Sequence, residues 1–335
     1  VKDLTGGRTL SASNSTWTNT GANNGRIRTG GSAVINNNGS WLDQLAFESA
    51  ISADFGGNAT FNNNGSYTKS GAGLTAIGIA FNNTSAGAGS GVVAVNAGTL
   101  RLSGGGTSNG SFTGAAGTTL SLGGNQVLQA GSSINTAGTV DFISGTNTLA
   151  GSFSAGTATT FTGGTTTFTG TVSAVGSTIA ASGGTGTFNN TQPFVVSALT
   201  IASGGLNFNN TGGVTTGTLG LTGGTLGGTS TVAVTGATTW SSGTMTGSGT
   251  TLAAGTLTIS GAAVKDLTGG RSLSASNTTW TNTGANNGRI RTGGTALIHN
   301  TGTWADQLAF DAAISPDFGG SATFDNSGVY TKSGS

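Results

Sequence analysis

The stretch FNNNGSYTKSGAGLTAIGIAFNNT, residues 61–84, begins and ends on the same motif, a Phe followed by two Asn, once at Phe61 and again at Phe81. Between the two motifs, short runs of alternating apolar and polar residues are interrupted by Gly, a pattern typical of strands joined by turns. A period of about 20 residues with strands and no helix predicts a solenoid in which each repeat is one coil. We therefore expect an all-β fold, a parallel β-solenoid of about 16 coils.

The same motif recurs along the chain. Phe188 and Phe208 also begin it, Ile35 begins a version with Ile in place of Phe, and Trp17 begins the similar stretch WTNTG. Apolar anchors continue at nearly constant spacing from Phe61 to Phe142. In a solenoid, equivalent residues of successive coils stack in columns about 4.8 Å apart. Asn tolerates turn conformations, and a column of Asn can pass amide hydrogen bonds from coil to coil. The Asn predicted to serve as turn or ladder residues are Asn36, Asn37, Asn62, Asn63, Asn82, Asn83, Asn189, Asn190, Asn209 and Asn210.

A second repeat operates at a larger scale. Residues 1–71 match residues 264–334 with 15 differences over 71 positions. We expect one full unit, residues 1–263, followed by the start of the next, residues 264–335. Within the first unit, residues 1–71 form a charged section, whereas residues 72–263 carry only two charges, Arg101 and Asp141. The sequence thus predicts a tandem array in a longer parent chain, with further copies of the repeat as its partners.

Composition excludes several classes of protein. Gly accounts for 64 of 335 residues and charged residues for 6%, but the many Thr and Val with 15 Phe and 5 Trp argue against disorder. A net charge of +1 gives no electrostatic footprint for nucleic acid. No apolar run reaches the roughly 18 residues that span a bilayer, so no membrane insertion is expected. The absence of Cys excludes disulfides and thiolate metal sites.

Catalytic and metal chemistry finds little support in the sequence. The one His, His299, corresponds to Asn36 of the first copy, so we expect it to stand in an Asn column. The nearest set of acids is Asp43, Glu48 and Asp54, and strand alternation places the first two on opposite faces. We expect no enzyme, no cofactor and no metal. Calcium is the alternative, because acids near Gly turns can bind it together with backbone carbonyls.

The segment WLDQLAFESAISADF, residues 41–55, enlarges one coil. Its large apolar residues fall on odd positions, so an extended conformation with these residues inward is predicted instead of a helix.

The stretch WTNTGANNGRIRTGG occurs at residues 17–31 and again at 280–294. Strand alternation turns Ile27 inward and both flanking arginines outward. A coil of about 18–20 residues places Glu48 beside Arg28, and Asp311 beside Arg291, as cross-strand ion pairs. The alternative is a patch for anionic polysaccharide, because Arg binds carboxylate and sulfate bidentately. The candidate ligand-binding residues are Arg26, Arg28, Trp41, Tyr67, Arg289, Arg291, Trp304 and Tyr330.

Four stretches, FNNNGSYTKSG, FNNTSAG, VVAVNAGTLRLSGGG and GTTLSLGG, resemble the β-strand repeats of very large secreted bacterial proteins. Autotransporter passengers and filamentous-haemagglutinin-like adhesins are the best-known families of this kind. The resemblance implies a right-handed parallel β-solenoid, secretion to the bacterial cell surface, and a role in adhesion or matrix building. It carries over no catalytic residues.

Two functions from different classes follow as hypotheses. The first is a structural segment of a secreted or cell-surface fibrous protein, such as a rigid stalk, matrix or filament unit. The second is a carbohydrate-binding adhesin domain that holds extracellular polysaccharide, and a polysaccharide-degrading β-helix enzyme is a remote third. Uncapped solenoid ends expose strand edges, which predicts end-to-end or lateral self-association.

Overall fold

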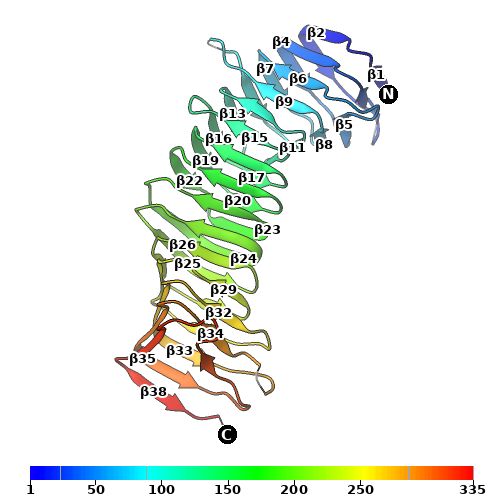
Figure 1. The fold of residues 1–335 in the computed structure, drawn as a ribbon. Coiled ribbons are helices and arrows are strands. Elements are labelled where there is room, and N and C mark those ends of the chain that lie inside the picture. Colours follow the sequence, from blue (N-terminus) through cyan, green and yellow to red (C-terminus); the bar gives the residue numbers. More distant parts are fainter. Residues whose placement is uncertain (23, 88, 286, 335) are drawn as a thin grey trace. The chain divides into compact units, whose positions relative to one another are not determined.

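The structure is a computed structural model that describes residues 1–22, 24–87, 89–285 and 287–334. It divides into two compact units, residues 1–176 and 177–335. Every regular element in the described part is a β-strand, so no helix there could cross a membrane. The strands of each unit pair in parallel with strands of the next coil (Figure 1), which confirms the predicted parallel β-solenoid.

Three parallel sheets run along the first unit, and each coil contributes one short strand to each sheet. The first sheet contains β1 (Lys2–Leu4), β3 (Ile27–Thr29), β5 (Ser49–Ser52), β8 (Leu74–Ile77), β11 (Thr99–Leu102), β14 (Thr119–Leu122), β17 (Thr139–Phe142) and β20 (Ala158–Phe161). The second contains β6 (Thr60–Asn63), β9 (Ala80–Asn83), β12 (Gly106–Ser108), β15 (Gln126–Leu128), β18 (Thr146–Leu149) and β21 (Thr165–Phe168). The third contains β7 (Ser66–Lys69), β10 (Val92–Val95), β13 (Ser111–Gly114), β16 (Ser133–Thr136), β19 (Ser152–Ala155) and β22 (Val172–Val175). Two longer strands, β2 (Thr9–Trp17) and β4 (Val34–Asp43), run through the second and third sheets without a break.

The second unit repeats this arrangement and opens on three long strands. These are β23 (Thr178–Phe188), β24 (Phe194–Phe208) and β25 (Val214–Leu221). The shorter strands that follow are β26 (Thr225–Gly228), β27 (Val232–Val234), β28 (Thr238–Trp240), β29 (Gly243–Met245), β30 (Thr250–Ala253) and β31 (Leu257–Ile259). The second copy of the charged section supplies β32 (Lys265–Leu267), β33 (Ser272–Trp280), β34 (Ile290–Thr292), β35 (Leu297–Asp306), β36 (Ile314–Ser315), β37 (Thr323–Asn326) and β38 (Val329–Lys332).

Coil length differs between the charged and the uncharged sections. In the uncharged section, Thr119 pairs with Thr139 on the next coil, which agrees with the predicted period. In the charged section, Val34 pairs with Thr60, so the coil there is several residues longer. Corner loops such as residues 44–48 and 53–59 supply the additional length. The enlarged coil that the sequence predicts at residues 41–55 is therefore confirmed, and the preceding coil, in which Thr9 pairs with Val34, is also longer than 20 residues.

The core consists of columns of apolar side chains, one from each coil. Leu10, Ile35, Phe61 and Phe81 occupy one column, in which the rings of Phe61 and Phe81 stack with centroids 5.1 Å apart. Trp17 is not in this column, because its register partner is Asp43. The anchors that follow belong to a different sheet, where the column contains Leu102, Leu122, Phe142 and Phe161. The regular spacing of the apolar anchors in the sequence therefore runs across two separate columns of the core.

The Asn ladder forms in the first unit on both sides of the sheet. Inside, the Asn37 amide donates to Asn63 Oδ1 at 2.7 Å, and the Asn63 amide donates to Asn83 Oδ1 at 2.8 Å. The outward-facing amides make the same bonds, with Asn62 donating to Asn36 and Asn82 to Asn62, each at 2.9 Å.

In the second unit, Asn300 makes this bond to Asn326 Oδ1 at 2.6 Å, but of the two Asn pairs at residues 189–210 one pair alone makes it. Asn209 donates to Asn189 Oδ1 at 2.8 Å. Asn190 and Asn210 instead both donate to the carbonyl oxygen of Gln192, at 3.2 and 3.0 Å. These two side chains close a turn and do not form an amide ladder.

Residues 41–55 are extended where they form strands, in the second half of β4 and in β5. Their odd positions face inward at Trp41, Leu45 and Ile51, as alternation predicts. Phe47 and Phe55 are exceptions, with 47% and 50% of their surfaces exposed. Both lie in corner loops, where the backbone leaves the strand and alternation no longer determines direction.

Candidate functional site

The arginines of the two RIR stretches are paired with acids. Arg28 binds Asp3 bidentately, with both bonds at 2.8 Å, and Arg291 binds Asp266 at 2.8 and 2.9 Å. The predicted pairs Arg28–Glu48 and Arg291–Asp311 are wrong. The coil is longer here than the sequence period predicts, so the register partner of Arg28 on the following coil is Ser52. Its acid lies on the preceding coil, where Asp3 is the register partner.

Arg26 and Arg289 complete the charged face. Arg26 Nη2 lies 2.7 Å from Asp54 Oδ1 and 3.0 Å from the Ser52 hydroxyl, and Arg289 forms the equivalent ion pair with Asp317. The hydrogen bond from Arg28 lowers the pKa of the Asp3 carboxyl below its usual value. Each of these guanidinium groups therefore has a carboxylate partner.

The aromatic half of the predicted ligand patch does not reach the surface. Trp41 is 4% exposed, Tyr67 0% and Trp304 1%, because strand alternation turns all three toward the core. Tyr330 is 42% exposed, since it lies on β38, the last strand of the second unit. The expectation that these rings stand beside the arginines as a sugar-binding patch is wrong for the three buried residues.

Behind the charged face lies a buried polar cluster around Asp43, which the sequence did not reveal. The Asp43 carboxylate accepts hydrogen bonds from the Tyr67 hydroxyl at 2.8 Å, the Thr75 hydroxyl at 2.6 Å and the Leu45 amide at 3.1 Å. Lys69 Nζ is 3.8 Å from Asp43 Oδ1, and both side chains are fully buried. The cluster joins β4, β7 and β8, so it ties successive strands of the coil stack together.

Burial sets the protonation of this cluster. It raises the pKa of the Tyr67 hydroxyl well above its usual value, and the Asp43 charge adds to the effect. Burial also lowers the pKa of Lys69, whereas the Asp43 charge acts in the opposite direction. The tyrosine therefore remains a neutral donor to the carboxylate.

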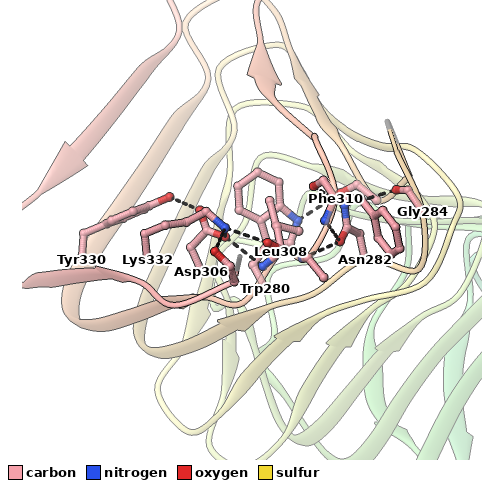
Figure 2. A network of polar contacts seen from close by, with 11 residues as sticks. Trp280, Asn282, Gly284, Asp306, Leu308, Phe310, Tyr330 and Lys332 are labelled. Atoms are coloured by element: carbon pink, nitrogen blue, oxygen red, sulfur yellow. Dashed lines mark hydrogen bonds and ion pairs between the residues drawn. The ribbon is translucent and has the colours of Figure 1, made fainter.

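The second copy rebuilds the cluster around Asp306 (Figure 2). Asp306 accepts from the Tyr330 hydroxyl at 2.7 Å and from the Leu308 amide at 3.0 Å, and Lys332 Nζ lies 3.5 Å from it. Lys332 also donates to the carbonyl oxygen of Leu308 at 2.7 Å. The repeated geometry shows that the cluster is a regular part of the charged section.

A second set of contacts fixes the corner loop that follows Asp43. We call residues 44–48 the Phe47 loop and residues 307–311 the Phe310 loop. Asn19 Oδ1 accepts from the Ala46 and Phe47 amides at 3.0 and 3.2 Å, while Asn19 Nδ2 donates to the Phe47 carbonyl at 2.8 Å. Asn282 makes the same three bonds to the Phe310 loop, at 3.1, 3.3 and 2.8 Å (Figure 2).

The remaining titratable groups do not converge. His299 Nε2 lies 3.5 Å from Asp325 Oδ2 and 3.3 Å from the Ser327 hydroxyl, and these two residues replace Asn62 and Asn64 of the first copy. The predicted Asn column therefore holds a His–Asp pair in the second copy. No group of three or more His, Asp or Glu that could hold a metal ion occurs among the described residues.

Two features of the sequence point to the Asp43 cluster and the Phe47 loop, which were not predicted. Tyr67 and Lys69 alternate in phase with the inward-facing Asn63 once the Gly65 corner is passed, which places Lys69 in the interior. Phe47, Asn19, Asp43 and Lys69 are all identical in the second copy, whereas Glu48 changes only to Asp.

No family model, curated protein or solved structure matches this chain.

Proposed function

We propose that this chain is a structural segment of a repetitive fibrous protein at the bacterial cell surface, a rigid stalk, matrix or filament unit. The observation that carries the proposal is the seam at which the second copy begins. There β29, β30 and β31 pair in parallel with β32 and β33, in the same way as strands within a unit. A new repeat therefore extends the existing stack and does not start a separate globule.

Side-chain hydrogen bonds, in addition to strand pairing, join the second copy to the first at the seam. Arg271 is fully buried and donates to the Thr251 hydroxyl at 3.1 and 3.0 Å and to the Thr246 carbonyl at 3.2 Å. Lys265, also fully buried, donates to the carbonyls of Gly261 and Ala263 at 3.1 and 2.8 Å. Arg271 thus meets acceptors on the preceding coil, and Lys265 meets acceptors in the corner that leads into the copied sequence.

The equivalent residues of the first copy show which side chains become buried at the seam. Lys2 and Arg8 are exposed, and Leu10 is 40% exposed, whereas its counterpart Leu273 is fully buried. In an array, each repeat would cover this surface on the next one. Secretion, the cell-surface location and contact with polysaccharide rest on the resemblance to adhesin repeats and are part of the proposal. We propose no enzymatic activity.

Electron microscopy of chains with one, two and three copies of residues 1–263 ahead of residues 264–335 tests the proposal. We expect a thin rod that lengthens by a constant increment with each copy, because each copy adds the same number of stacked coils. A Leu273→Asp variant, which buries an unpaired charge at the seam, should produce a flexible joint there. Compact particles without a constant increment would contradict the proposal.

A further inference from the structure

Two phenyl rings stand at the surface with an open face. Phe47 is 47% exposed and Phe310 is 50% exposed. The other exposed phenylalanines in the described part of the chain, Phe55 and Phe318, each lie under a guanidinium group, 4.8 and 4.7 Å from the ring centroid. No described aromatic ring or guanidinium group covers Phe47 or Phe310 in this way. The ring is thus exposed and uncovered at the same place in both copies.

The backbone that carries Phe47 is held on both sides. Asn19 binds the amide and the carbonyl of Phe47, and Asp43 binds the Leu45 amide. The following coil contributes Gly73, whose amide donates to the Leu45 carbonyl at 3.0 Å. A Cβ at Gly73 would lie 2.6 Å from the Phe47 carbonyl carbon, so only Gly permits this packing. The loop is therefore ordered before any ligand arrives, which lowers the entropic cost of binding.

An acid stands next to each ring. Glu48 and Asp311 are exposed, and neither makes an ion pair or hydrogen bond with another described residue. The change from Glu to Asp between the copies keeps the carboxylate. Both loops therefore carry the same two groups at consecutive positions, an exposed phenyl ring followed by a carboxylate.

We propose that the Phe47 and Phe310 loops are sugar-binding subsites for a neutral polysaccharide. The C–H bonds on one face of a pyranose ring carry small positive charges, which match the negative face of a phenyl ring. Neighbouring hydroxyls of the same sugar can donate charge-assisted hydrogen bonds to Glu48 or Asp311. An acidic sugar fits less well, because its carboxylate or sulfate would be repelled by the same side chain. This activity goes beyond the structural role and does not depend on it.

One ring and one carboxylate bind a sugar weakly, so tight binding requires that more than one repeat contacts the same polysaccharide. A polysaccharide chain long enough to engage two repeats of an array would bind the second one intramolecularly, and such avidity raises affinity by about 10²-fold or more. An array of repeats would present one subsite per repeat. The expected ligand is therefore a long polymer and not a short oligosaccharide.

Affinity electrophoresis of the full chain in native gels tests the proposal. The gels would contain dextran or hydroxyethyl cellulose as neutral polymers, or hyaluronan as an acidic one. We expect retardation by at least one neutral polymer and none by hyaluronan. The double variant Phe47→Ala with Phe310→Ala weakens both subsites and should reduce binding at least about tenfold, as should Glu48→Gln with Asp311→Asn.

The matched control is Phe55→Ala with Phe318→Ala, which removes two equally exposed rings that already lie under arginines. This variant should bind like the parent chain, and circular dichroism with thermal melting should show that all variants remain folded. The proposal is overturned by no retardation in either neutral gel, by retardation in hyaluronan alone, or by equal loss of binding in the control.

Discussion

The charged section and the uncharged section use the same columns of the solenoid differently. On the second sheet, the inward column begins with Asn37, Asn63 and Asn83 and continues through Ser108 to Leu128, Leu149 and Phe168. On the third sheet it begins with Asp43 and Lys69 and continues with Val95. The column on the second sheet thus changes from polar to apolar along the first unit, and the column on the third sheet loses its charged groups after Lys69.

Apolar columns and polar columns contribute to the fold in different ways. An apolar column tolerates a shift of one coil, because one Leu or Phe packs on another much as the next one does. A buried Asp–Lys pair or Asn ladder satisfies its hydrogen bonds in one register only, and leaving a partner unpaired is costly. The polar interior thus specifies the register once per repeat, and the apolar section extends the stack.

The largest effect should come from breaking the Asp43 cluster. Asp43→Ala leaves the Lys69 cation buried without its acid and removes the acceptor of Tyr67, which should cost about 3–5 kcal/mol of unfolding free energy. Asp141→Ala, in the uncharged section, removes an acid that accepts only from the hydroxyls of Thr160 and Thr162, so its effect should be much smaller. Urea unfolding of both variants measures the difference. Equal losses would mean that the polar interior has no special role.

A pH experiment separates a buried cation with an acid from one without. Lys265 is bonded only to carbonyls, and burial lowers its pKa from 10.5 to about 8. Between these two values the unfolded chain binds more protons at this site than the folded chain, so the unfolding free energy should rise with pH. Lys265→Met should flatten this rise between pH 8 and 9.5, as measured by urea unfolding in parallel buffers.

The control for this experiment is Lys2→Met, the same change in the first copy, where the lysine is exposed. It should leave the pH dependence of the parent chain intact. If Lys2→Met and Lys265→Met alter the pH dependence alike, the seam does not place Lys265 in the interior.

The smallest effect should come from the outer face of the charged section. Arg28→Ala removes the ion pair with Asp3 and the contact with the Phe55 ring, both at the surface. Such pairs contribute about 0–1 kcal/mol, and salt screens them further. Thermal melting at low and high salt should therefore show a small loss that shrinks as salt is added. A loss as large as that of Asp43→Ala would mean that the surface arginines determine the register of the coils.

Repeat period and alternation predicted much of this architecture. The parallel solenoid, the inward turn of Ile27 and the Asn37–Asn63–Asn83 contacts all follow from residues spaced in phase with the coils. Prediction failed at Arg28, because a coil of 18–20 residues was assumed there although corner loops lengthen the coils of the charged section. The acid paired with Arg28 was misplaced for this reason.

The surface rings were missed for a related reason. Alternation was extended through all of residues 41–55, and this placed Phe47 and Phe55 on the same face as Trp41, Leu45 and Ile51. In a corner, direction depends on side-chain contacts from other coils, here those of Asn19 and Arg28. Such contacts link residues a full coil or more apart and have no counterpart in local sequence.

The coil-to-coil pairing also determines how far a growing chain must extend before it can fold. Every paired strand within the two units finds its partner one coil away in the sequence, as Val214 does in Val232 and Ser40 does in Ser66. Contacts this short in sequence separation need little loop closure, and a stack in which each coil touches only its neighbours can add coils one at a time. A chain threaded end first through a narrow exit could therefore fold as it emerges, and each new coil would hold the preceding one in place.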